Sequence, residues 1–377
     1  MIYLDNSATT RPSAAVREAM DKAMDEGFFN PSALYAPALT VKKEMQLCRD
    51  LILRKLHCPE GTVVFTGCGT EADNLMILGT LSSLREGRVL YSAGEHPAVR
   101  EACLRAGYVK AEEIPYNEKG MTDLEKLRDM LGPDVKMICV MQVNNETGAI
   151  QPLSEIAKLR DEMCPSALLH VDGVQGFMRV PFDMTACGAD SYALSGHKIH
   201  APKGIGALVM GKRCHVSARL PGGGQEKGLR SGTENTPGIA GLRAAIENYP
   251  GSDRMRECKA HLYELLREKL PQVIVNGPEP NESGAAPHIL NVSLPPVRSE
   301  TMLHALEGDG IYVGIGSACA SNKQKVAGTL QKMHVKRENA ESALRFSLCP
   351  DNTMEEMEQT AAAIEKHYAL LSRYARR

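Results

Sequence analysis

The sequence is poor in several features that mark whole classes of protein. It has no tryptophan, and no apolar run approaches the roughly 18 residues that a membrane-spanning helix needs. Its first residues lack the basic and apolar segments of a secretory signal. The formal net charge is -2, so no excess of positive charge favours nucleic acid or an anionic membrane surface. We therefore expect a cytoplasmic protein that binds neither nucleic acid nor membrane directly.

Cysteines are present, but they lack the spacing of a metal site or a redox pair. There are eleven, and the closest of them, Cys48, Cys58 and Cys68, are ten positions apart. A C-x2-C zinc site or a thioredoxin-type pair needs much closer cysteines. In a reducing cytoplasm, most of the eleven should be small buried hydrophobic residues. The sequence predicts no metal centre.

Short apolar runs alternate with amphipathic stretches along the first 250 residues, which predicts an α/β fold with a mostly parallel sheet. The predicted strands are Thr62–Phe65, Arg88–Tyr91, Met137–Val143, Ala167–Val171 and Asp190–Leu194. Predicted helices between them include 122–131, with Thr122 and Glu125 as a capping box, and 153–163. The short turn before a further strand at 206–210 predicts one antiparallel pair.

The length of 377 residues exceeds what one hydrophobic core usually organises, so we expect two domains. Composition turns polar around residues 250–253, and a long helix is predicted over 255–270. A final helix is predicted to begin with Thr353 and Glu356 as a capping box and to run to about Tyr374. We place the domain boundary near residue 250.

Ser195-Gly196-His197-Lys198 follows one predicted strand, and Lys198 comes 26 residues after Asp172, which ends another. This arrangement suits pyridoxal phosphate. A lysine binds its aldehyde covalently, a carboxylate keeps the ring nitrogen protonated, and hydroxyl groups hold the phosphate. Gln175 would place an amide near the ring hydroxyl. Taken singly, Lys198 could be a surface lysine and Asp172 a helix N-cap.

Further polar groups follow other predicted strands. The glycine turn at 67–69 precedes a helix predicted to begin near Thr70, where free backbone N–H groups suit a phosphate, although Thr70 alone could be an ordinary N-cap. His96 could stack on the cofactor ring and move protons, and Asn145 lies in a predicted turn. An active site in an open α/β sheet requires such a gathering beyond the strand ends.

Eight ordered motifs together resemble the cysteine desulfurases, the NifS-like members of the class V aminotransferases. They span nearly the whole chain, and their number makes the resemblance specific. The motifs are Tyr3-Leu4-Asp5-Asn6-Ser7-Ala8-Thr9-Thr10, Thr70-Glu71-Ala72-Asp73-Asn74, Val143-Asn144-Asn145-Glu146, His170-Val171-Asp172, Ser195-Gly196-His197-Lys198, Arg230-Ser231-Gly232-Thr233, Gly316-Ser317-Ala318-Cys319 and Arg345-Phe346-Ser347-Leu348.

The resemblance implies the type I fold of PLP-dependent transferases and a homodimer. It implies a large cofactor domain of residues 15–250 and a small α+β domain of residues 1–14 and 251–377 that carries the catalytic cysteine loop. By resemblance, Lys198 would carry the cofactor, Asp172 and Gln175 would bind its ring nitrogen and ring oxygen, and His96 would stack above the ring. The implied phosphate ligands are Gly69, Thr70, Ser195, His197 and Thr233 of the other subunit. The implied ligands of the substrate carboxylate are Asn145 and Arg345.

The resemblance also implies the reaction. L-cysteine would become L-alanine, and its sulfur would pass to Cys319 as a persulfide and then to an acceptor protein, either an iron–sulfur scaffold or a tRNA-thiolation enzyme. Small residues surround Cys319, which suits a mobile loop, and the nearby Lys323 and Lys325 could favour its thiolate.

Three alternatives remain open at this point. A selenocysteine lyase, or another class V enzyme such as an aminotransferase or a kynureninase-like hydrolase, could use the same cofactor site. Only the Cys319 segment argues against the aminotransferase and the hydrolase. A non-catalytic PLP-binding or sulfur-carrier protein is a third reading, but such a protein would have no use for Lys198, His96, Arg345 and Cys319 together.

Overall fold

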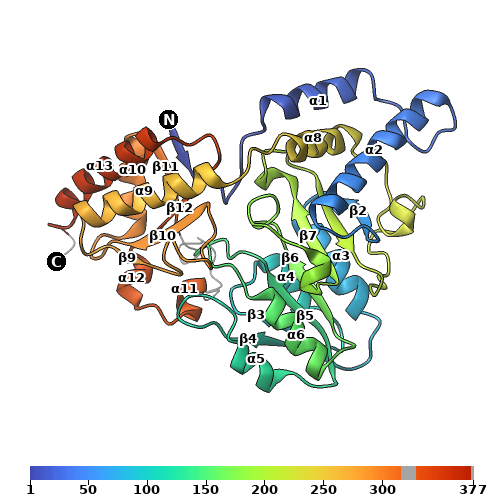
Figure 1. Ribbon diagram of the computed structural model, residues 1–377, viewed down its shortest axis with the longest axis horizontal. Coiled ribbons are helices and arrows are strands. Elements are labelled where there is room, and N and C mark those ends of the chain that lie inside the picture. The colour runs from blue at the N-terminus through green and yellow to red at the C-terminus, as the bar shows by residue number, and fades with distance from the viewer. Residues whose placement is uncertain (316–327, 375–377) are drawn as a thin grey trace.

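The apolar runs form two separate sheets in the computed structural model, which describes residues 1–315 and 328–374 (Figure 1). A seven-stranded sheet has the order β2-β8-β7-β6-β5-β3-β4, and a five-stranded sheet has the order β1-β11-β12-β10-β9. Figure 1 shows the two sheets in different halves of the molecule. The fold is therefore α/β with mixed sheets, as predicted.

The larger sheet is built mostly from parallel neighbours. Its strands are β2 (Thr62–Thr66), β3 (Arg88–Ser92), β4 (Lys110–Ile114), β5 (Val135–Met141), β6 (Leu168–Asp172), β7 (Ser191–Ser195) and β8 (Gly206–Met210). The predicted antiparallel pair of β7 with β8 is confirmed. Strand β8 also pairs antiparallel with β2, so the sheet has a second antiparallel pair that the local sequence did not reveal.

Both faces of the larger sheet are covered by helices, which explains why its strands are apolar throughout. Along β5, Ile138 and Val140 join one apolar cluster while Met137 and Cys139 join another. The second cluster includes α3 (Gly69–Leu81) and α4 (Pro97–Leu104). Helices that contribute to the first cluster are α1 (Ala14–Asp25), α2 (Ala36–Lys55), α5 (Leu124–Met130), α6 (Leu153–Met163), α7 (Met184–Cys187) and α8 (Thr236–Glu247).

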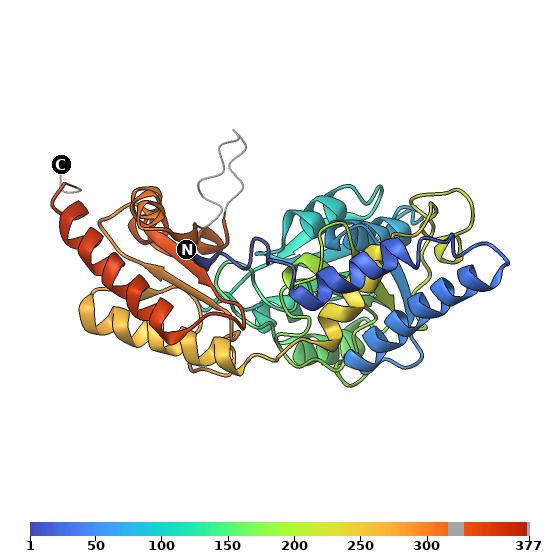
Figure 2. The same cartoon turned by 90° about the horizontal axis from the view of Figure 1, so that it is seen from above.

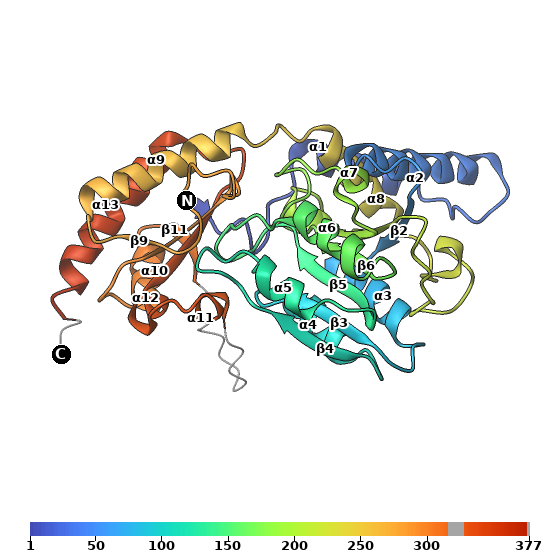
Figure 3. The same ribbon diagram turned by 60° about the horizontal axis from the view of Figure 1, so that its bottom comes forward.

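The smaller sheet joins the first residues of the chain to the last third. Strand β1 (Ile2–Leu4) pairs in parallel with β11 (Ile311–Ile315). The other strands are β9 (Ile274–Val275), β10 (Ile289–Ser293) and β12 (Ala343–Ser347). Its helices are α9 (Asp253–Lys269), α10 (Ser299–Gly308), α11 (Thr329–Lys332), α12 (Arg337–Glu341) and α13 (Met354–Leu371). Helices α9 and α13 lie side by side, and the N-terminus lies near the junction of the two halves (Figures 2 and 3).

Of the two predicted capping boxes, the structure contradicts one and confirms the other. The capping box at Thr122 is wrong, because Asp123 caps α5 by accepting from the backbone N–H groups of Glu125 and Lys126 at 3.0 Å each. The Thr122 hydroxyl instead donates to Gln151 at 2.9 Å. The second capping box, at Thr353, is confirmed, but its helix ends at Leu371 rather than near Tyr374. The division into domains of residues 15–250 and of 1–14 with 251–377 stays a prediction.

Within the described ranges, no helix has the length and apolar character needed to cross a membrane.

Candidate active site

A cavity of about 420 Å³ lies beyond the carboxyl ends of the strands of the larger sheet and is closed by residues of the N-terminal segment and of β12. Ten of the predicted site residues line it: Gly69, Thr70, His96, Asn145, Asp172, Gln175, Ser195, His197, Lys198 and Arg345. Thr233 is exposed and does not line it, and Cys319 falls outside the described residues. A larger cavity of about 830 Å³ beside α1, α2 and α8 shares no residue with it.

One end of the cavity is built to receive an anion. Helix α3 begins at Gly69, so the backbone N–H groups of its first turn have no partners within the helix. A Cβ atom at Gly69 would lie 2.6 Å from Val174, so only glycine lets the chain pass so closely. The buried Ser195 hydroxyl, at the end of β7, has no hydrogen-bond partner within the described part of the chain. Together these groups offer neutral donors to a ligand.

His197 lies at the same end and is held as a neutral ring. Its Nδ1 atom is 3.1 Å from the hydroxyl of Thr9. Burial, assisted by the charge of Lys198, lowers the pKa of His197 to about 4. A neutral imidazole can donate one N–H without adding a full charge to the site.

The carboxyl end of β6 places Asp172 in the cavity wall. Its Oδ1 atom accepts from the backbone N–H of Val174 at 2.9 Å, and no described residue forms an ion pair with it. Burial raises the pKa of Asp172 above its ordinary value. A buried carboxylate of this kind is stabilised by a cationic hydrogen-bond donor, such as a protonated ring nitrogen.

His96 is the N-cap of α4, and this role fixes its tautomer. Its Nδ1 atom accepts from the backbone N–H of Ala98 at 3.1 Å. Burial lowers the pKa of His96, so the ring is neutral and carries its proton on Nε2. The sequence prediction placed this ring near the reacting atoms, where such a donor can take part in proton transfer.

Lys198 ends a short 3-10 turn after β7, and its Nζ atom donates to the carbonyl groups of Ser7 at 2.5 Å and Ala8 at 2.8 Å. Burial lowers the pKa of Lys198 to about 8, and the guanidinium groups of Arg179 and Arg345 act in the same direction. An amine with this pKa is roughly one-tenth neutral at pH 7, a few hundred times more than an ordinary lysine, and can act as a nucleophile or base.

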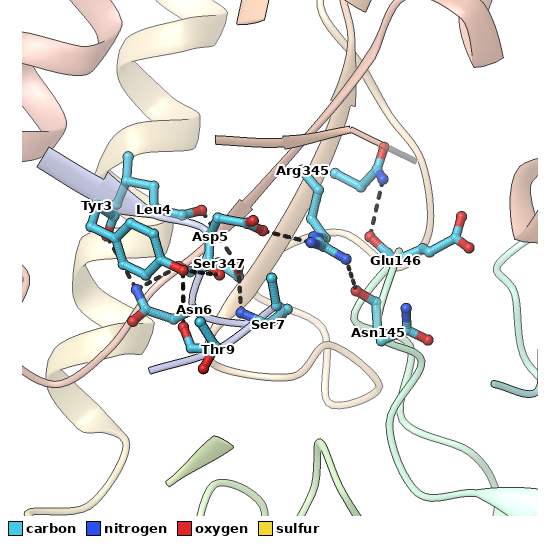
Figure 4. A network of polar contacts seen from close by, with 12 residues as sticks. Tyr3, Leu4, Asp5, Asn6, Ser7, Thr9, Asn145, Glu146, Arg345 and Ser347 are labelled. Carbon is cyan, nitrogen blue, oxygen red and sulfur yellow. Dashed lines mark hydrogen bonds and ion pairs between the residues drawn. The ribbon is translucent and has the colours of Figure 1, made fainter. Parts of the chain in front are cut away.

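Arg345 enters the cavity from β12 in the smaller sheet (Figure 4). Its Nη2 atom donates to Asp5 at 2.6 Å, and its Nη1 atom donates to the backbone carbonyl of Asn145 at 3.0 Å. Its buried Nε atom has no hydrogen-bond partner among the described residues. The guanidinium therefore has a donor left for a ligand carboxylate.

Some residues of the site were not assigned a role from the sequence. Asp5, which pairs with Arg345, lies in one of the quoted motifs, so its carboxylate was a signal that could have been used. Arg179 donates to Gln175 at 2.7 Å, and nothing in the local sequence distinguishes it from a surface arginine. Asp73 lines the cavity and is 3.1 Å from His170, a buried pair that only the folded chain brings together.

The residues present fit pyridoxal phosphate. The unpartnered Ser195 hydroxyl and the first turn of α3 suit its phosphate, and the buried Asp172 suits its ring nitrogen. Lys198, with a lowered pKa, suits its aldehyde. The described residues contain no group of His, Cys, Asp and Glu side chains arranged to hold a metal ion.

Comparisons with known proteins agree with this geometry. The profile of the class-V aminotransferase family matches residues 2–360. A cysteine desulfurase from Nostoc sp. is 34% identical over 358 residues, which cover 93% of this chain and 88% of that protein. A solved NifS-like protein from Rickettsia africae has 30% identity and a TM-score of 0.87, covering 98% of this chain and 99% of its own. The structure of SspA in complex with cysteine has 26% identity and a TM-score of 0.80, covering 94% and 100%.

Proposed function

This chain belongs to the class-V aminotransferase family as a PLP-dependent cysteine desulfurase, and from that premise we propose that it moves the sulfur of L-cysteine to Cys319 and then to an acceptor protein. The observation that carries the proposal is the meeting of Lys198, Asp172 and Arg345 in one cavity. A nucleophilic amine, a buried carboxylate and a guanidinium with a free donor are what an amino acid and this cofactor require together.

When bound, pyridoxal phosphate supplies an electron-accepting ring that stabilises the charge left when an amino acid loses its Cα proton. Lys198 would hold the cofactor, and its amine, with a pKa lowered to about 8, would accept the Cα proton of the substrate. Asp172 would keep a proton on the ring nitrogen, and Gln175 would donate to the ring oxygen. The neutral donors at the start of α3 and Ser195 bind the phosphate.

Arg345 orients the substrate. Its unpartnered Nε atom and one Nη atom can bind a carboxylate with two parallel hydrogen bonds, which fixes the direction of the Cα–H bond. Asp5 and the carbonyl of Asn145 hold the guanidinium in place from two different sides (Figure 4). The Asn145 side chain, which also lines the cavity, is our second candidate for the carboxylate.

Sulfur transfer then needs a thiolate. The Cys319 sulfur forms a bond to the sulfur of the substrate while the substrate C–S bond breaks, and the carbon product gains protons to become L-alanine. The protein is left with a persulfide, whose outer sulfur passes to a thiolate of the acceptor. An iron–sulfur scaffold or a tRNA-thiolation enzyme is the acceptor that we propose.

The other cysteines provide a test of this assignment. Burial raises the pKa of Cys48 and of Cys214 to about 12 and that of Cys349 to about 11, so these thiols stay protonated and are poor nucleophiles. Among the described cysteines, only Cys68 lines the active-site cavity. Cys68 is therefore the rival thiol and the matched control.

The experiment is to incubate the holoenzyme with L-cysteine and to assay alanine and sulfide in the presence of a reducing thiol. Lys198→Ala should remove the visible absorbance and both products. Cys319→Ala should keep the absorbance but lose sulfide release, whereas Cys68→Ala should keep both. Sulfide release that survives in Cys319→Ala and disappears in Cys68→Ala would contradict the assignment. Products formed from L-selenocysteine but not from L-cysteine would favour a selenocysteine lyase.

We also propose that the enzyme is a cytoplasmic homodimer in which Thr233 completes the phosphate site of the other subunit. Thr233 is exposed and lies outside its own cavity, on a segment that an ion pair of 2.9 Å from Arg230 to Glu71 ties to α3. Mixing Lys198→Ala with Thr233→Ala chains tests this. In the mixed dimer the Lys198→Ala chain supplies an intact Thr233 to the other site, so cofactor affinity should recover in that half.

A further inference from the structure

Arg179 is a buried cation that the mechanism above does not use. Only 3% of its surface is exposed. It lies in the segment after β6, four residues after Gln175. No carboxylate forms an ion pair with it among the described residues. Because burying an unpaired guanidinium is costly, its neighbours must offset that cost with hydrogen bonds.

Two of these neighbours belong to the cofactor site. The Nη1 atom of Arg179 donates to the side-chain oxygen of Gln175 at 2.7 Å, and its Nη2 atom donates to the backbone carbonyl of Lys198. Its own backbone carbonyl accepts from the hydroxyl of Ser252 at 2.7 Å, which ties it to the start of α9. One guanidinium thus contacts both the amide and the lysine that face the cavity.

The contact with Gln175 decides which way its amide points. A guanidinium has donors only, so the atom that meets Arg179 must be the amide oxygen. The amide nitrogen then donates to the carbonyl of Ser7 at 2.9 Å, and its second hydrogen is left for a ligand. Without Arg179 the amide could turn over and present its oxygen to the cavity. An amide oxygen would repel an anionic ring oxygen.

The second contact fixes Lys198 from its main chain. Ser7 links the two, because its carbonyl accepts from both the Lys198 amine and the Gln175 amide. The charge of Arg179 also acts on the amine, in the same direction as burial. Other charged or titratable groups act on Lys198 or Arg179 from the surrounding elements: Arg345, Asp172, Asp5, His288, Tyr249 and Cys349.

We propose that Arg179 is a positioning residue of the cofactor site, which fixes Gln175 as a hydrogen-bond donor to the cofactor and holds the main chain of Lys198 with the same guanidinium. This rests on the proposed binding of pyridoxal phosphate by Lys198. Arg179 would act only through Gln175 and Lys198 and would not touch the reacting atoms.

The test is a pH titration of the visible absorbance of the holoenzyme without substrate, for the natural protein, Arg179→Met and Arg179→Lys. Removing the cation and the fixed amide donor both favour the protonated chromophore, so Arg179→Met should raise the titration midpoint by about one pH unit, a tenfold change in proton affinity. Arg179→Lys keeps the charge but cannot donate in two fixed directions. Its midpoint should rise by a smaller amount.

Arg160→Met is the matched control. Arg160 is equally buried, but it pairs with Asp190 at 2.7 Å and does not line the cavity, so its loss should reduce stability and leave the midpoint unchanged. Gln175→Ala should raise the midpoint, and combining it with Arg179→Met should add less than the sum of the two shifts.

The outcomes separate the two proposals. A natural protein that binds no pyridoxal phosphate would overturn the cofactor function itself. A visible band that titrates at the same pH in Arg179→Met and in the natural protein would overturn only the role of Arg179. If Arg179→Met does not fold, Arg179→Lys provides the test. An unchanged midpoint in Arg179→Lys would overturn the role of Arg179. Shifts of Arg179→Lys and Gln175→Ala that simply add in the double variant would also overturn it.

Discussion

The two ends of the cavity differ in the charge of the groups that we propose as ligands for anions. At the phosphate end, the described candidate ligands Gly69, Thr70, Ser195 and His197 carry no full charge, since burial keeps His197 neutral. At the substrate end, a guanidinium faces the cavity and is partly balanced by a carboxylate. The difference suits the proposed ligands. A resident group can be held by many fixed dipoles, whereas a substrate that must bind and leave is recognised by one strong charge.

Among substitutions at the two ends of the cavity, that of Arg345 should give the largest effect. Arg345→Lys keeps the positive charge but loses the planar pair of donors, so kcat/KM for L-cysteine should fall about 100-fold, or roughly 3 kcal/mol. Cofactor affinity, measured by titrating the apoprotein with pyridoxal phosphate, should stay unchanged. Arg337→Lys is the control, because Arg337 is an exposed arginine of the smaller half. Equal losses of substrate and cofactor affinity in Arg345→Lys would erase the distinction between the two ends.

The positive charge of Arg345 should also affect the pH dependence of the reaction between Lys198 and the cofactor aldehyde. Attack on the aldehyde needs the neutral amine of Lys198, whose pKa is lowered to about 8. The rate at which the apoprotein gains colour should therefore level off above pH 8 and fall by about tenfold for each unit well below it. Stopped-flow absorbance between pH 6 and pH 10 measures this, with each rate divided by the rate constant for the neutral form of butylamine at the same pH to remove the titration of the cofactor.

Two variants sharpen that measurement. Arg345→Met removes one of the positive charges that lower the pKa of Lys198, so its midpoint should move to higher pH. Arg345→Lys keeps the charge and should leave the midpoint in place. A midpoint near the ordinary lysine value in the natural protein would mean that neither burial nor the two guanidinium groups act on the amine as described.

The phosphate end should respond more mildly, because its binding energy is divided among several neutral donors. Ser195→Ala removes one hydroxyl and should weaken cofactor binding at least about tenfold, the low end of what a hydrogen bond to a charged group contributes. KM for L-cysteine should not change. Ser293→Ala removes a buried hydroxyl of the smaller sheet, which donates to Asn339 at 2.7 Å, and should leave cofactor affinity intact. A Ser195→Ala effect on KM alone would assign this hydroxyl to the substrate.

Local sequence patterns predicted six of the seven strands of the larger sheet and missed the edge strand β4, whose sequence Lys-Ala-Glu-Glu-Ile has no apolar run. The predicted Thr62–Phe65 and Arg88–Tyr91 strands each end one residue early, and 137–143 is displaced by two residues from β5. The displacement has a physical cause. Gln142 and Val143 follow β5 directly but lie outside the strand, where Val143 lines the cavity and forms a bridge with Ile150 around the turn at Asn145. The pairing of β1 with β11 could not be predicted in this way, because no local pattern encodes contacts between residues 309 positions apart, such as Ile2 and Ile311.

The residues of the candidate site also differ in whether local sequence patterns could identify them. Residues that follow strands in recognisable motifs, such as Asp172 and Lys198, could be named from the sequence and lie in the cavity. Arg179 could not, since its role depends on which atoms surround it after folding. Sequence motifs thus identify the groups that touch a ligand better than the groups that hold them in place.

The smallest predicted effect concerns Asp5, which balances the guanidinium at the substrate end. Its carboxylate accepts from Arg345 at 2.6 Å, so it both holds the guanidinium and repels an incoming substrate carboxylate. Asp5→Asn keeps an oxygen acceptor and removes the charge, so KM for L-cysteine should fall about threefold, less than 1 kcal/mol. Asp5→Ala also loses the acceptor and should raise KM, since the guanidinium is then free to turn. A rise in KM for both variants would show that the charge of Asp5 orients Arg345 more than it competes with the substrate, and the substrate end would then be a preformed ion pair.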